Sequence, residues 1–313
     1  MTLKTCKQPK LPVHHRLIRD MSNEAYHGVK GTWSSTQFKT ILEDEEVFIQ
    51  TYIKGNGVKV EGEALDTGTY FHTGVLEPHK VHSEIVVYPG KTRFGKNWES
   101  FKDKHKGKCI IIDRQKIQGD GMIQAVKSSP SSMEYLKGEP EVSLFTEIVV
   151  EHGSIYAPYY FMMMTSEGWV KVKKVPKGDF SLSIKTRADC LGETFISDLK
   201  STSGRANKSD SVRGSISKYK YDLSASLYLD MFSLVRPQVT EFVWIFASKE
   251  NPVAAPWRAT RKNILIGRAK WMWAVRRLAE LSEANWEQVD YLREAEPLPH
   301  ELEWLTHSDT DLL

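Results

Sequence analysis

The stretch that most constrains the fold runs from Ile184 to Ser201, because it reads as two short strands joined by a tight turn. Gly192 marks the turn, and β-branched and apolar residues fill both arms. Side chains alternate across a strand, so Asp198 and Lys200 project to one face while Leu199 points to the core. The hairpin therefore brings Asp189, near the end of the first arm, beside that pair.

Such an arrangement predicts a metal site. Two carboxylates held together repel each other unless a cation neutralises them. The oxygens of Asp189 and Asp198, with the backbone carbonyl of Leu199 between them, suit Mg²⁺. Lys200 is then placed to orient a water or to stabilise negative charge on a phosphate. The alternative interpretation of the same spacing is a hairpin with solvated charges at its tip.

Composition restricts the class of protein. The chain has 313 residues, of which 40% are hydrophobic and 27% charged, as in a soluble globular protein. No apolar run approaches the roughly 20 residues that cross a bilayer, and the first residues lack the apolar core of a signal peptide. We therefore expect a cytoplasmic protein with no membrane partner. Its three cysteines, Cys6, Cys109 and Cys190, lie too far apart for a cysteine-spaced zinc or iron–sulfur cluster.

Positive charge is concentrated in local stretches, although the net charge is only +3. Three stretches are rich in lysine and arginine: 91–108, 171–187 and 258–277. Basic surface around a carboxylate cluster is typical of a site that binds and cuts a phosphodiester backbone. Ordinary solvated surface is the alternative for each stretch.

The remaining pattern predicts one mixed α/β domain. A capping box at Ser34 and Gln37 predicts the start of a helix that continues to Tyr52. Its N-terminus, with Ser35 and Lys39, is a candidate phosphate site, or merely a cap. We expect a tail over 1–20, a domain over 21–285 with an inserted hairpin at about 152–180, and a second tail over 286–313.

The other expected elements follow from periodicity and turn residues. A short helix at 64–78 carries His72, with Gly68 and Gly74 permitting close packing against a neighbour. A lone histidine on such a helix is usually a core residue. Strands are expected at 83–89, 109–112, 141–150 and 241–248, and helices at 98–105, 113–127, 131–136, 216–234 and 261–281.

Several motifs, in order, resemble the RecE (exonuclease VIII) type of recombination nuclease in the PD-(D/E)xK superfamily, which includes lambda exonuclease. The resemblance covers roughly 21–247. Its motifs are Ser22-Asn23-Glu24-Ala25-Tyr26-His27, Asp66-x-Gly68-Thr69-x-Phe71-His72-x-x-Val75-Leu76-Glu77-Pro78, Glu141-Val142-Ser143-Leu144-Phe145, Arg187-Ala188-Asp189 and Asp198-Leu199-Lys200-Ser201-Thr202.

The resemblance implies the fold and the site residues. It implies a restriction-endonuclease-like α/β fold with a two-layer core, in which helices flank a mixed sheet. Asp189, Asp198 and the Leu199 carbonyl would bind Mg²⁺, for which Mn²⁺ substitutes, and Lys200 would assist the attacking water. Glu141 and His72 would complete the catalytic and metal site, with Glu147 and Glu151 as rivals to Glu141. Candidate DNA contacts are Ser35, Lys39, Lys185, Arg187, Ser224 and Tyr228.

The resemblance also implies an activity. It is that of a 5′-to-3′ exonuclease on double-stranded DNA ends, which leaves a 3′ single strand for an annealing protein of the RecT or Red-beta type. Such enzymes work as ring-shaped trimers or tetramers. Ser224 stands where relatives usually have glutamine, which puts one DNA or water contact in doubt. The alternatives are a structure-specific or single-strand nuclease of the same superfamily, and a non-catalytic module that binds DNA ends.

Overall fold

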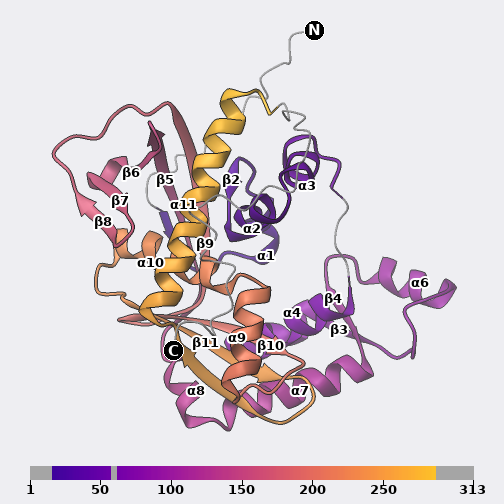
Figure 1. The fold of residues 1–313 in the computed structure, drawn as a ribbon. Coiled ribbons are helices and arrows are strands. Elements are labelled where there is room, and N and C mark those ends of the chain that lie inside the picture. The colour runs from indigo at the N-terminus through magenta and orange to yellow at the C-terminus, as the bar shows by residue number, and fades with distance from the viewer. Residues whose placement is uncertain (1–15, 58–61, 287–313) are drawn as a thin grey trace.

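The computed structural model describes residues 16–57 and 62–286. Residues 16–20, expected to belong to a tail, include strand β1 (Arg16–Ile18), which pairs with β5 in an antiparallel register. The rest of the two expected tails, 1–15 and 287–313, lies outside the described residues. Helices and strands are interspersed along the chain, with the strands β5 to β10 following one another in sequence (Figure 1).

The elements have the following bounds. The strands are β2 (Thr32–Trp33), β3 (Ile85–Tyr88), β4 (Cys109–Ile112), β5 (Glu139–Glu151), β6 (Ser154–Ala157), β7 (Met162–Thr165), β8 (Gly168–Lys171), β9 (Phe180–Leu191), β10 (Phe195–Thr202), β11 (Glu241–Ser248) and β12 (Ala254–Arg258). The helices are α1 (Asn23–Gly28), α2 (Ser35–Glu43), α3 (Glu45–Phe48), α4 (Glu63–Leu76), α5 (Val81–Glu84), α6 (Lys96–Lys104), α7 (Asp113–Lys127), α8 (Pro130–Glu134), α9 (Ser209–Lys218), α10 (Tyr221–Val235) and α11 (Arg261–Glu283). Short 3₁₀ segments lie at Pro78–Lys80 and Pro158–Tyr160, and a π segment at Ile49–Ile53.

One large mixed sheet organises the molecule. Its strand order is β12-β11-β10-β9-β5-β6-β7-β8, with β1 on β5 and β2 on β9. The β10–β11 pair is parallel and is connected through α9 and α10, as a parallel pair requires a crossover. The β9–β10 pair is the predicted hairpin, with Leu191 opposite Ile196.

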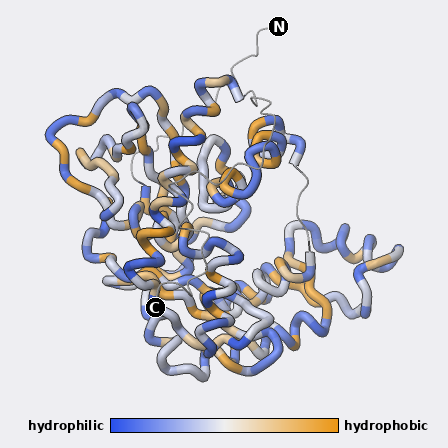
Figure 2. Tube along the Cα trace, in the orientation of Figure 1, coloured by the Kyte–Doolittle hydropathy of each residue, from blue (hydrophilic) through white to orange (hydrophobic). Residues whose placement is uncertain are grey.

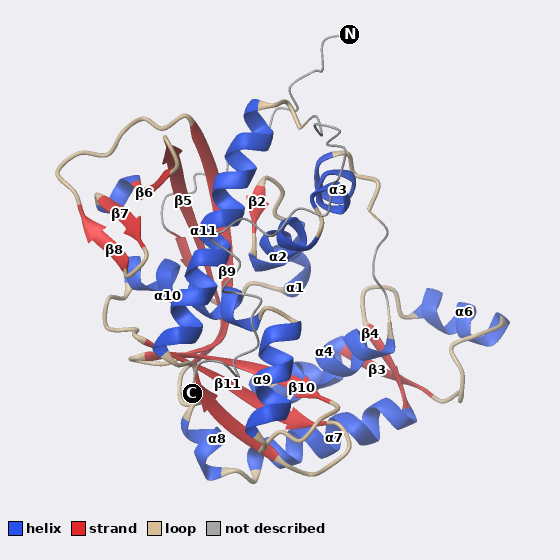
Figure 3. Cartoon of the chain, in the orientation of Figure 1, coloured by secondary structure: helices blue, strands red, loops and turns tan. Residues whose placement is uncertain are grey.

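Helices cover both faces of the sheet at β10 and β11 (Figure 3). Strand β11 is buried on both faces and reads as a nearly continuous apolar run. Phe242, Trp244 and Phe246 belong to the main core with α10 and α11, while Val243 and Ile245 pack with residues of α4 and α7. Hydrophobic segments gather along these contacts (Figure 2). The predicted α/β fold is confirmed, but the sheet is the middle of three layers here rather than one of two.

Two predicted helices are broken. The helix expected over 216–234 is divided into α9 and α10, because Lys220 adopts a left-handed conformation with φ of 48°. The helix expected to run from Ser34 to Tyr52 ends at Glu43. There Asp44 is extended, and its side chain caps α3 by accepting a hydrogen bond from the Val47 N–H at 3.0 Å. Competition of an aspartate side chain for backbone donors explains this second break.

Two smaller parts extend the core. The expected inserted hairpin is a run of three strands, β6 to β8, that continues the main sheet from β5. On the other side, β3 and β4 form a separate parallel pair, and α6, between them in sequence, projects from it (Figure 1). Within the part of the chain that is described, we find no helix with the length and apolar character to span a membrane.

Candidate metal and nucleic-acid site

The hairpin positions two aspartates where its strands separate. Cys190 pairs with Ser197, so Asp189 and Asp198 follow at the next position of the register. The Asp189 Oδ2 atom accepts a hydrogen bond from the Leu199 N–H at 2.8 Å. The predicted approach of the two aspartates is therefore present, with Asp189 turned toward the backbone of the second strand.

Glu141 reaches the same place from the neighbouring strand. Along the β5–β9 pair, Pro140 lies opposite Cys190 and Val142 opposite Ala188, which places Glu141 opposite Asp189. Glu141 has a φ of 51°, a left-handed conformation that is rare outside glycine and is often found at functional sites. The rival Glu147 pairs with Ser183 further along the sheet, and Glu151 is the last residue of β5, where it pairs with Ser154. Of the three glutamates, only Glu141 is near Asp189.

Helix α4 supplies the histidine. Gly74 lies so close to α7 that an added Cβ would fall 2.3 Å from the Ile123 Cδ1 atom, so the predicted close packing holds at this glycine. A Cβ added at Gly68 would instead meet no atom within 4 Å, and Gly68 lines the cleft, which corrects its expected packing role. Docked in this way, α4 places the His72 Nδ1 atom 3.3 Å from Asp189 Oδ2.

His72, Glu141 and Asp189 form a compact set of metal-ligand types. One ligand atom from each residue lies within 4.8 Å of the others. We refer to these residues as the His72–Glu141–Asp189 cluster. Asp198 is not part of this group of three; it is buried beside it and forms an ion pair with Lys200, with 2.5 Å between Oδ2 and Nζ.

Lys200 is held in place from several sides. As predicted, Leu199 points into the core between α4, α7 and β11. The Lys200 ammonium donates to the Leu199 carbonyl at 3.2 Å and lies 5.0 Å from the centre of the Tyr221 ring. The carbonyl proposed as a metal ligand is thus already an acceptor for lysine. The Lys39 ammonium lies 5.3 Å from the same ring centre.

Electrostatics indicate that nearby positive charge only partly balances the negative charge of the clustered carboxylates. Burial, with the Asp189 charge, raises the pKa of Glu141 to about 8. Burial, with the Asp198 charge, also raises the pKa of Asp189. Burial alone would lower the pKa of Lys200, but attraction by Asp198 and Asp189 outweighs it and raises that pKa. Buried Asp198 Oδ2 receives no well-directed hydrogen bond. Crowded, buried carboxylates of this kind fit a divalent cation.

The raised pKa of Glu141 predicts a pH dependence of stability. From pH 4.5, the ordinary pKa of the glutamate, to about pH 8, the folded chain keeps a proton that the unfolded chain releases. This group therefore lowers the free energy of unfolding as pH rises through that window, by at most about 1.4 kcal/mol per pH unit. Glu141→Gln should flatten the dependence of the free energy of unfolding on pH, which urea denaturation measures with chelator present. Curves of unfolding free energy against pH that run parallel for the variant and the wild type would contradict the raised pKa of Glu141.

A cleft of about 650 Å³ opens onto the cluster. Its lining includes His72, Glu141, Asp189 and Lys200, with Tyr228 and Arg187 from the candidate DNA contacts. It also includes residues to which sequence reasoning gave no role: Asn23, His27, Glu77 and Tyr221. Asn23, His27 and Glu77 lie in motifs noted in the sequence. The pattern alone did not tell which side chains face the cleft.

The candidate DNA contacts divide into two groups. Tyr228 lines the cleft and is hydrogen-bonded to Ser35, while Lys39 lies beside Tyr221. Lys185 is buried and donates to the carbonyls of Tyr26 and Val29, at 3.1 and 3.3 Å, and Ser224 is buried away from the cleft. In this conformation Lys185 and Ser224 cannot reach DNA, which corrects their expected role as contacts.

Arg187 has a supporting position at the edge of the cleft. Its guanidinium donates to Ser143 Oγ at 2.9 Å and to the Met21 carbonyl at 2.7 Å, and lies 3.3 Å from Glu141 Oε2. It is also within 4.3 Å of the Tyr26 ring centre. These contacts hold the Arg187 guanidinium against Glu141 and α1, so it has little freedom left to bind a phosphate of DNA.

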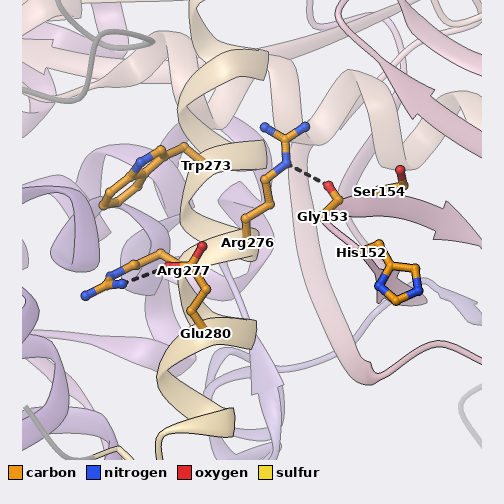
Figure 4. Close-up of a pocket in the computed structure, with 7 residues that line it drawn as sticks. All are labelled: His152, Gly153, Ser154, Trp273, Arg276, Arg277 and Glu280. Carbon is orange, nitrogen blue, oxygen red and sulfur yellow. Dashed lines mark hydrogen bonds and ion pairs between the residues drawn. The ribbon is translucent and has the colours of Figure 1, made fainter.

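Most basic side chains of the stretch 258–277 form ion pairs with other residues of the fold. Arg268 pairs with Asp230, Lys270 with Asp222, and Arg277 with Glu45. A hollow between α11 and the β5–β6 turn is lined by Arg276 and Arg277 (Figure 4). There Arg276 donates to the Gly153 carbonyl at 2.8 Å, while Arg277 also pairs with Glu280. The expectation that this stretch converges on the carboxylates is wrong for these side chains.

Comparison with known proteins agrees with this fold. Residues 34–155 match the family described as a PDDEXK-like domain of unknown function (DUF3799). A crystal structure from Eubacterium rectale, described as a putative exonuclease, superposes with a TM-score of 0.53 at 12% sequence identity, covering 92% of this chain and 99% of that one. Among curated proteins, none matches the chain.

The two matches and the sheet agree on the fold. The large mixed sheet with flanking helices is a PD-(D/E)xK-like fold, and the family match covers α2 to β5, including His72 and Glu141. Asp189, Asp198 and Lys200 lie beyond the matched residues, but the sheet brings Asp189 and Lys200 to the same cleft, with Asp198 buried beside them. Together these findings agree on a PD-(D/E)xK-like fold for this chain.

Proposed function

We propose that the protein is a divalent-metal-dependent exonuclease that hydrolyses phosphodiester bonds at the ends of double-stranded DNA. The observation that carries the proposal is the meeting of His72, Glu141 and Asp189 at the cleft, beside the Asp198–Lys200 pair. Hard oxygen ligands next to an ammonium group are suited to a phosphodiester, whose hydrolysis builds up negative charge on oxygen.

Each residue has a role in the proposal. Asp189 and Glu141, with His72 at their side, would hold Mg²⁺ or Mn²⁺, and Asp198 would add charge and hold Lys200. When bound, such an ion lowers the pKa of water and polarises a phosphate oxygen. Lys200 would orient the attacking water or stabilise the phosphate oxygens, since Asp198 keeps its ammonium protonated and directed to the cleft. Lys39, across the Tyr221 ring, would attract the substrate backbone.

The finer parts of the proposal are supported by the motif resemblance. On that basis the enzyme would digest in the 5′-to-3′ direction and leave 3′ overhangs for an annealing protein in recombination. It would assemble as a trimeric or tetrameric ring around the duplex. Native mass spectrometry of the full chain tests the ring, and a monomer under conditions of full activity would contradict it.

Digestion of linear duplexes labelled at either 5′ or 3′ ends tests the activity. With Mg²⁺, we expect early release of the 5′ label as short products. The 3′ label should stay on its strand until late in the digestion. With chelator, neither label should be released. Closed circular duplex is the matched substrate without ends, and it should stay intact.

The same assay separates the alternatives. Cleavage confined to branched or single-stranded substrates would indicate another nuclease of the superfamily. End binding without metal-dependent loss of either label would indicate a binding module and contradict the proposal.

A further inference from the structure

The strands inserted between β5 and β9 carry an exposed surface that the cleft does not use. Three apolar or aromatic side chains there are well exposed: Tyr159 at 42%, Phe161 at 51% and Val170 at 42%. Four exposed lysines follow directly: Lys171, Lys173, Lys174 and Lys177. We call these seven residues the insert surface. It lies on the opposite side of the molecule from α6 (Figure 1).

The backbone brings the aromatic and basic parts together. Phe161 adopts a left-handed conformation with φ of 54°, which is unfavourable for a bulky residue. Its carbonyl accepts a hydrogen bond from the Val172 N–H at 2.8 Å, and Met162 pairs with Lys171. Lys171 and Lys173 flank Val172 and therefore start from backbone positions next to the backbone of Phe161.

Protection of a sheet edge does not account for this charge. Lysine on an edge strand blocks pairing with other chains, and β8 is at the end of the strand order. Of the four lysines, however, only Lys171 lies in β8; the other three follow its end. Pairing of two copies through β8 would also bring these like charges together. The charge instead complements a polyanion.

We propose that the insert surface binds single-stranded nucleic acid. Exposed aromatic rings stack on unpaired bases, and neighbouring lysines hold the phosphates. In a duplex the base faces are stacked on one another, so exposed rings favour the single strand. The inference rests on the proposed function, because the strand would be the one that end digestion leaves. Phe180, which follows the insert surface in the chain, lies about 30 Å from Asp189 along β9, at about 3.3 Å per residue.

Fluorescence anisotropy with a labelled oligothymidylate, in chelator, tests the inference independently of cleavage. Phe161→Asn keeps a residue that tolerates the left-handed conformation and should weaken binding by at least about fivefold. The double variant Lys173→Gln/Lys174→Gln should reduce the slope of log affinity against log salt by about 1.4. The matched control is Lys127→Gln/Lys137→Gln, which removes the same charge from exposed positions near α7 and α8 and should change nothing.

Other outcomes of the binding and mass measurements would overturn the inference. Unchanged affinity in both test variants, or an equal loss in the control, would show that the insert surface is not the binding site. An equal loss for blunt duplex would show that it does not select single strands. A change in native mass in the test variants would assign the surface to a second copy of the chain. If the wild-type protein bound oligothymidylate as expected but showed no nuclease activity in the digestion assay, only the proposed function would be contradicted.

Discussion

Asp198→Ala should reduce metal-dependent cleavage by at least about 10²- to 10³-fold, the range found when one group that stabilises a transition-state charge is removed. Asp198 contributes in two ways. It holds the Lys200 ammonium at 2.5 Å, and it adds negative charge beside Asp189. Without it, Lys200 keeps the Leu199 carbonyl, the Tyr221 ring and the attraction of Asp189. Initial rates on end-labelled duplex, with excess Mg²⁺, measure the loss.

Binding to duplex ends should survive this change, because Asp198 does not line the cleft. Asp198→Asn is the second variant, since it keeps the shape of the side chain and limits any effect on folding. Glu147→Ala, which removes an acid from β5 away from the cluster, is the matched control and should cleave normally. Wild-type rates in both Asp198 variants, with unfolding curves unchanged, would show that the site has been assigned wrongly.

Arg268→Ala should lower the free energy of unfolding by about 3–5 kcal/mol, as expected when one partner of a buried ion pair is removed. Arg268 of α11 and Asp230 of α10 are only 9% and 4% exposed, and their closest N–O distance is 2.6 Å. Arg268 also donates to the Ser166 carbonyl at 2.9 Å, which ties the β7–β8 turn to the helices. Loss of the Arg268 side chain leaves the buried Asp230 carboxylate without its main positive partner. Urea denaturation measures the change.

A double variant separates pairing from packing. Replacing both partners, as Arg268→Met/Asp230→Leu, removes the unpaired charge and should recover much of the lost stability. Arg261→Ala is the control, because Arg261 lies on the same helix but pairs with Glu167 at an exposed position, where an ion pair contributes little to the free energy of unfolding. A loss below about 1 kcal/mol for Arg268→Ala would contradict the structural role of the pair.

Local pattern predicted much of the fold. The apolar run of β11, the hairpin of β9 and β10, and the helix α7 appear at or close to their expected bounds. Each is specified by neighbours in the sequence. The breaks at Asp44 and Lys220 were missed because the helical spacing of apolar residues continues through both, while a side-chain cap and a left-handed residue interrupt the backbone.

The site was less predictable because it depends on register between distant segments. Glu141 could be distinguished from Glu147 only by its place opposite Asp189 in the β5–β9 pair. Lys185 resembled a DNA contact in sequence, yet its ammonium holds carbonyls near α1 that are 156 and 159 residues away in the chain. Arg268 and Asp230 are 38 residues apart, so no local pattern announced their pairing. Charge in a sequence does not reveal its partner.

Calorimetric titration of Mn²⁺ into the chain, without DNA, addresses the metal site most directly. We predict saturable binding by the wild-type protein and by Glu147→Gln, and its loss in Asp189→Asn, since Asp189 links His72, Glu141 and the second strand of the hairpin. Binding of Mn²⁺ by Asp189→Asn with the same affinity and stoichiometry as the wild type would contradict the account.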